Sequence, residues 1–234
     1  MKVYLAGTSG IRDAFCNGSI LAKDCNILES FYSIQDWQTV MIPQYKSFLL
    51  DSGAFTFLNS QKKGNRIDFE KYADAYADYI KENNIKYYFE LDIDSIVGLP
   101  EVERLRRRIE SRSGIQSIPV WHKGRGKDYF LSICKDYRYV AIGGIVTQEI
   151  PRSVYEKMFP WFIVKAHEVG SKIHGLGYTN LAGLKKYHFD SVDSTSWSRG
   201  SRWGEVCQYD PHEHTLNIIS GREKTEKRRL KDPK

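Results

Sequence analysis

Short apolar runs that end in Gly, Asp or His recur along the chain and alternate with segments of helical periodicity. The runs predict buried strands at residues 2–7, 47–53, 86–94, 117–122, 139–144, 172–177 and 188–195. Helical spacing over residues 21–37 leads into an expected helix before Pro43, and further helices are predicted within residues 68–84, 100–114, 127–135, 151–170 and 181–187. The clearest is 68–84, where Asp68 is placed to cap the first turn.

The run at residues 86–94 alternates in polarity. Tyr87, Phe89, Leu91 and Ile93 share one parity, and Tyr88, Glu90, Asp92 and Asp94 share the other. Successive side chains of a strand point to opposite faces. We therefore expect the first set to face outer helices and the acidic set to face the inner side of the sheet.

Strand and helix alternate throughout, which predicts an α/β fold with a parallel sheet and right-handed crossovers. Seven units and a weak eighth, at residues 206–210 or 216–219, favour a compact and imperfect (β/α)8 TIM barrel. A doubly wound open sheet is the alternative, but no GxGxxG follows the first strand. We expect one barrel domain over residues 1–220 and a basic tail over 221–234.

Composition narrows the class of protein. No apolar run is long enough for a membrane span, and the amino terminus reads as a strand, so we expect a cytoplasmic protein without membrane partners. The four cysteines show no CxxC or CxCxxC spacing, and we expect neither metal nor cofactor. The formal net charge of +6, partly concentrated in residues 221–234, favours a polyanionic partner such as nucleic acid.

Candidate chemistry collects at the predicted strand ends. These positions are Asp51, Asp92, Asp94, Trp121, His122, Gly143, Gly144, His174, Gly175, Asp190 and Asp193. Paired carboxylates suit displacement at a sugar anomeric carbon, where one attacks and the other moves protons. Taken alone, Asp51 reads more readily as a turn or helix cap, and acids at a barrel mouth also suit a Mg²⁺-dependent lyase or hydrolase.

Six stretches, in order, resemble the tRNA-guanine transglycosylases (queuine tRNA-ribosyltransferases). They are DSGAF at Asp51, LDID at 91–94, VWHKG at 120–124, AIGGIVTQE at 141–149, HGLG at 174–177 and FDSV at 189–192. The likeness is strongest to short, phage-type members with LDSGAFTF and SVDSTSW, which are linked to the insertion of 7-deazaguanine bases into DNA. For a phage protein the compartment would be the host cytoplasm.

The resemblance implies a role for each matching residue. Asp51 corresponds to the general acid/base, Asp92 to the acid that binds the purine edge, and Asp193 or Asp190 to the nucleophile, with strand parity favouring Asp193. Further substrate-binding positions are Asp94, Ser52, Gly53, His122, Gly143, Gly144, Ile145, His174 and Gly175. Trp197, Arg199, Arg202 and Trp203 form a candidate nucleic-acid surface or, equally, aromatic packing at the barrel rim.

The sequence also departs from the family. The CxCxxC…His zinc motif is absent, so we expect no zinc subdomain, and the chain is much shorter than the tRNA enzymes. The expected function is exchange of guanine in DNA for a free 7-deazaguanine base through a covalent Asp-glycosyl intermediate. The alternatives are base exchange in tRNA and a non-catalytic nucleic-acid-binding barrel.

Overall fold

The computed structural model describes residues 1–54, 56–57, 67–198, 205–210, 212 and 215–220. The chain divides into two compact units, Met1–Ser194 and Thr195–Lys234. The boundary between the two compact units falls where the last strand of the parallel sheet ends.

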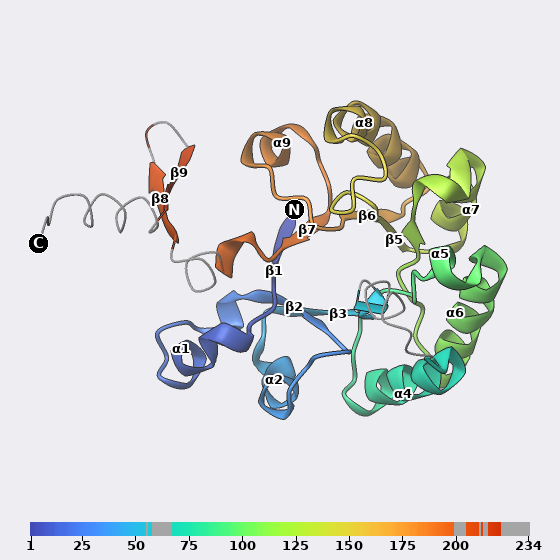
Figure 1. Cartoon of the computed structure of the whole chain (residues 1–234), viewed down its shortest axis with the longest axis horizontal. Helices are drawn as coiled ribbons and strands as arrows, with labels where there is room; N and C mark the ends of the chain where they lie inside the picture. The colour runs from blue at the N-terminus through green and yellow to red at the C-terminus, as the bar shows by residue number, and fades with distance from the viewer. Residues whose placement is uncertain (55, 58–66, 199–204, 211, 213–214, 221–234) are drawn as a thin grey trace, which may run out of the picture. The chain divides into compact units, whose positions relative to one another are not determined.

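The first unit is built on a curled, parallel, seven-stranded sheet with helices around it (Figure 1). The strands lie in the order β3 (Ser47–Asp51), β2 (Asn26–Ser30), β1 (Lys2–Ala6), β7 (Ser191–Ser194), β6 (Lys172–Gly175), β5 (Tyr139–Ile142) and β4 (Val120–Trp121). This is a TIM-like α/β fold. The named strands of the described residues do not close into the eight-stranded barrel that the sequence predicts.

Two isolated bridges lie between the edge strands β3 and β4. Tyr88 pairs with Leu50 of β3, and Phe89 pairs with Ile118, just before β4. The Phe89 N–H donates to Leu50 O at 3.0 Å, and the Ile118 N–H donates to Tyr88 O at 2.8 Å. These contacts link the two edges without forming a regular strand.

Helices follow the strands on the outside of the sheet. They are α1 (Arg12–Cys16), α2 (Asp36–Met41), α4 (Phe69–Glu82), α5 (Asp94–Val97), α6 (Leu99–Ser113), α7 (Gly126–Asp136), α8 (Arg152–Glu168) and α9 (Leu181–Lys186). As expected, Asp68 caps α4, accepting the Lys71 N–H at 3.0 Å. Since α4 and α6 lie side by side, Arg104, Arg108 and Arg112 pair with Glu70, Asp74 and Asp78.

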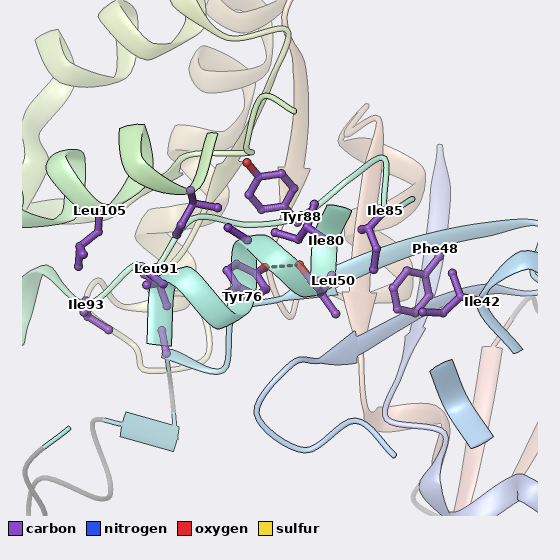
Figure 2. Packing of buried hydrophobic residues seen from close by; sticks show 14 of the residues in the cluster. Ile42, Phe48, Leu50, Tyr76, Ile80, Ile85, Tyr88, Leu91, Ile93 and Leu105 are labelled. Carbon is purple, nitrogen blue, oxygen red and sulfur yellow. Dashed lines mark hydrogen bonds between the residues drawn. The ribbon is translucent and has the colours of Figure 1, made fainter. Parts of the chain in front are cut away.

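The apolar residues of the sheet divide between its two faces. Leu50 belongs to a cluster with residues of α4 and α6, and Figure 2 shows its carbonyl beside the Tyr76 hydroxyl, which donates to it at 3.2 Å. The neighbouring Leu49 belongs instead to a cluster with Tyr4 and Val120 from other strands. The alternation of strand side chains thus separates an outer core from an inner one.

The helix expected before Pro43 is present as α2 (Asp36–Met41), but the helical spacing over residues 21–37 is misleading in its central part. The segment contains β2, which lies between β1 and β3, and helix α2 begins only at Asp36. Ile27 and Leu28 are buried on opposite faces of this central strand, so its pattern is a short apolar run that periodicity does not distinguish from a helix.

The parity predicted for residues 86–94 is wrong at residues 88–90 and right at Leu91 and Ile93, which pack in the outer cluster. Tyr88 packs in the outer cluster and Phe89 in the inner one. The carboxylate of Glu90 is buried and ion-paired to Arg106 of α6 at 3.0 Å and to Arg125 at 2.6 Å. These two guanidinium groups neutralise the acid where the alternation pattern places an apolar face.

The expected eighth barrel strand is wrong as well. Residues 206–210 and 216–219 fall in β8 (Glu205–Asp210) and β9 (Thr215–Ser220), which pair with each other as an antiparallel two-stranded sheet in the second unit. None of the helices in the described part of the chain is long and apolar enough to cross a membrane.

Candidate active site

Acidic and imidazole side chains gather at the carboxyl ends of the parallel strands. Asp51 ends β3, His174 lies in β6 and Asp193 in β7, while His122 directly follows β4. Parallel strands bring these ends to one edge of the sheet, where α/β proteins place their chemistry. These four residues therefore lie toward the same edge of the sheet.

Asp51 is held in a turn at the end of β3. Its Oδ2 accepts the Gly53 N–H at 3.0 Å, and Gly53 has a φ of +83°. A Cβ on Gly53 would lie 2.5 Å from Cβ of Tyr32, so this turn requires glycine. Burial, together with the negative charges of Asp92 and Asp193, raises the pKa of Asp51 to about 7 against the opposing Gly53 hydrogen bond.

Asp193 is 9% exposed and is anchored through one oxygen. Its Oδ1 lies 3.0 Å from Nε2 of His174 and accepts the Gly177 N–H at 2.8 Å. Among the described residues, no hydrogen-bond donor contacts Oδ2. The carboxylate is therefore fixed in orientation through Oδ1.

Asp92 is one end of a charged triad with His122 and Glu149. Nε2 of His122 lies 3.1 Å from Oδ2 of Asp92, and Nδ1 lies 2.7 Å from Oε1 of Glu149. Burial lowers the pKa of His122, but the hydrogen bonds and charges of the two carboxylates outweigh it and raise the pKa to about 10. A protonated His122 in turn lowers the pKa of Glu149.

The glycines after β5 allow this triad to lie against the sheet. A Cβ on Gly143 would lie 2.6 Å from Cε1 of His122, so any side chain there would displace the ring. Gly144 and Ile145 continue the loop that leads to Glu149. The loop backbone thereby lies beside the Asp92–His122 pair.

The remaining predicted residues lie in varied surroundings. Asp94 begins α5 and pairs with Arg125 at 3.0 Å, which also holds Glu90. Ser52 is buried, and Gly175 ends β6 beside the Phe189 ring.

Asp190 precedes β7 at the amino-terminal end of the strand. Its Oδ2 accepts the Ile173 N–H at 2.8 Å and lies 2.9 Å from Nε2 of His167. It therefore lies at the opposite end of the strand from the site.

The predicted nucleic-acid surface falls in the second unit. Trp197 is partly buried within a 3-10 helix, Ser196–Ser198. Arg199, Arg202 and Trp203 lie outside the described residues.

Two residues of the site were not among the sequence candidates. Glu149 lies in a loop, and its pairing with His122 spans 27 residues; the acid that ends the AIGGIVTQE stretch was its only signal. Ser191 of β7 contacts Nδ1 of His174, and a serine inside a strand gives no such signal.

Comparison with known proteins adds no family: neither a protein-family model nor a curated protein sequence matches the chain. Within the described residues, no group of three or more His, Cys, Asp or Glu is arranged to hold a metal ion.

Proposed function

We propose that this protein is a base-exchange transglycosylase that replaces guanine in DNA with a 7-deazaguanine base. The observation that carries the proposal is the pair formed by Asp51, which titrates near neutral pH, and Asp193, which keeps one oxygen without a donor among the described residues. Displacement at a glycosidic carbon requires these two roles, a carboxyl that exchanges protons and a carboxylate that attacks.

In the first half-reaction, Oδ2 of Asp193 attacks C1′ of the target nucleotide. The C1′–N9 bond breaks, its electron pair passes to N9, and the Asp51 carboxyl gives its proton to the departing guanine. In the second half-reaction, N9 of the incoming 7-deazaguanine gives its proton to Asp51 and attacks C1′, which releases Asp193. A pKa of about 7 lets Asp51 serve in both protonation states near neutral pH.

Base recognition is the role of the Asp92–His122–Glu149 triad. A guanine-like base presents an N1–H and an exocyclic amine on one edge, which a carboxylate accepts as a pair of hydrogen bonds. His122 fixes the Asp92 carboxylate from one side. The loop from Gly143 supplies backbone groups beside it.

The eighth barrel position belongs, in this proposal, to the segment around Tyr88 and Phe89 that bridges β3 and β4. DNA is the preferred polymer because the LDSGAFTF and SVDSTSW stretches resemble the phage-type enzymes, and because the chain is basic. Reaching C1′ in a duplex requires base extrusion or a single-stranded site.

Labelled guanine and 7-deazaguanine, offered with DNA or with tRNA, test the assignment. We expect label in DNA only and a covalent protein–DNA adduct. Asp193→Asn should abolish the adduct, whereas Asp190→Asn, the matched control, should retain it. Label in tRNA only would overturn the DNA assignment, and binding without label in either polymer would favour the non-catalytic barrel.

A further inference from the structure

A continuous hydrogen-bonded chain of side chains runs inside the sheet away from Asp193. Asp193 contacts Nε2 of His174, Nδ1 of His174 contacts the Ser191 hydroxyl, and that hydroxyl contacts the Tyr139 hydroxyl. His174 is 0% exposed and Ser191 is 1% exposed. This series of hydrogen bonds begins at Asp193, near the carboxyl end of β7, and ends at Tyr139, the first residue of β5.

The donors of this chain can all point the same way. Burial raises the pKa of the Tyr139 phenol, which therefore keeps its proton and donates to Ser191. The Ser191 hydroxyl then donates to Nδ1 of His174, so that the proton of a neutral imidazole lies on Nε2 and is donated to Asp193. Each donor is matched to one acceptor, and the last hydrogen bond of the series is accepted by the Asp193 carboxylate.

The surroundings of His174 keep the ring in place. The Phe89 ring lies 5.1 Å from it and the Tyr4 ring 6.2 Å, both belonging to the apolar inner cluster. A polar ring buried among apolar side chains needs both nitrogens satisfied. Here the two partners are Ser191 and the carboxylate that the proposed reaction uses as its nucleophile.

We propose that His174 is the positioning residue of the Asp193 nucleophile and that Ser191 and Tyr139 fix its tautomer. This inference rests on the proposed function. The Nε2–H and the Gly177 N–H both hold Oδ1, which directs Oδ2 toward the sugar. Because the ring is fully buried, its role is to orient the carboxylate and not to stack on a base.

Two substitutions of His174 separate positioning from packing. The Gln side-chain amide reaches the place of Nε2 and can still donate to Asp193, whereas the Asn amide reaches only the place of Nδ1. We expect His174→Asn to slow single-turnover adduct formation about 10²-fold, the loss typical of a misplaced reacting group, with binding of DNA unchanged. His174→Gln should remain within a few-fold of the wild type.

A spectroscopic readout tests the chain without activity. In the full-length protein, the ¹⁵N shifts of the His174 ring should be those of a neutral imidazole protonated on Nε2. Tyr139→Phe removes one hydroxyl at the far end of the chain and should shift the Nδ1 signal of His174. If His174→Asn does not fold, Tyr139→Phe still tests the hydrogen-bond series, because it leaves His174 in place.

The outcomes distinguish this inference from the proposed function. If Asp193→Asn removes the adduct but His174→Asn reacts as fast as the wild type, the positioning role is wrong and the function stands. An adduct that persists in Asp193→Asn overturns the proposed nucleophile itself. A Nδ1-protonated neutral ring, or a ring signal unchanged in Tyr139→Phe, overturns the tautomer assignment.

Discussion

At the scale of single residues, the charged form of Asp51 is disfavoured by its own site. Its pKa is raised from 3.8 to about 7 by burial and by the charges of Asp92 and Asp193. Between these two values the folded protein holds a proton that the unfolded chain has released. Stability therefore falls as the pH rises through this window, because unfolding releases this proton and a higher pH favours its release.

Asp51→Asn mimics the neutral carboxyl and should stabilise the protein where the wild type is ionised. We expect a higher melting temperature at about pH 8, by about 2–4 °C for each kcal/mol recovered, and no difference near pH 4. Base exchange should fall about 10²–10⁴-fold, since the proton carrier is lost. Thermal unfolding across this pH range checks the first part, and a variant less stable than the wild type at pH 8 would contradict it.

His122 has the same sign of linkage as Asp51, but here the site favours the charged form of the group. Its pKa is raised to about 10 by Asp92 and Glu149 despite its burial, so the protonated ring stabilises the fold fully below about pH 6.5. This stabilisation is lost as the pH rises through about 10. The contribution belongs to the triad and not to either carboxylate alone.

His122→Gln should therefore cost about 1–3 kcal/mol of unfolding free energy at about pH 6, the usual loss for a buried charged partner. The cost should shrink toward pH 10, as measured by urea unfolding. His167→Gln is the control, because the His167–Asp190 pair is 43% and 32% exposed. Equal costs for His122→Gln at both pH values would show that its charge does not stabilise the fold.

Sequence alone located Asp51, His122 and Asp193 at one sheet edge because each follows or ends an apolar run. It did not foresee Glu149 or Ser191. Their roles depend on contacts between distant segments, and neither residue type marks such a contact by itself. The candidate site residues could thus be predicted from the sequence only where a polar residue stands at the end of a strand.

At the scale of elements, the sequence predicts those strands whose apolar run ends in Gly, Asp or His. It does not predict a strand whose side chains are buried on both faces of the sheet, because such a run lacks a distinctive period. β2 was missed for this reason. Within residues 86–94 the predicted parity fails at residues 88–90, because Glu90 pairs with two arginines on the helical side, and it holds at Leu91 and Ile93. A charged residue in a strand therefore marks the inner face of the sheet only where no oppositely charged side chain on the helical face can pair with it.

Glu90 joins three elements, and its loss tests their cohesion. Its carboxylate binds Arg106 of α6, Arg125 and, at 2.7 Å, the Val120 N–H of β4. Glu90→Gln removes the buried negative charge between Arg106 and Arg125, which then keep only Glu103 at 3.6 Å and Asp94 at 3.0 Å as charge partners. We expect a loss of about 3–5 kcal/mol in urea unfolding.

The control is Asp74→Asn, which breaks the exposed Asp74–Arg108 pair between α4 and α6. Exposed pairs contribute little, so this variant should unfold close to the wild type. If the two variants unfold alike, the Glu90 network is not the link between these elements.

At the scale of the whole molecule, the curled parallel sheet confirms the α/β class that strand–helix alternation predicts. The expected closure through residues 206–219 is wrong because β8 and β9 pair with each other. The sequence pattern counts strands but does not say which strands pair, since pairing depends on contacts between distant residues. The α/β class by itself does not test the proposed binding of nucleic acid, so that proposal needs a measurement of binding.

The basic tail, residues 221–234, offers that test. It carries seven Lys or Arg against three acids and lies outside the described residues. If it contacts phosphates, its removal should weaken DNA binding and lower the slope of log affinity against log salt by about 1 for each lost contact. Base exchange at saturating DNA should persist, because Asp51 and Asp193 lie in the first unit. Filter binding or anisotropy at several salt concentrations measures the slope. A truncated protein with an unchanged slope would place the phosphate contacts elsewhere on the chain.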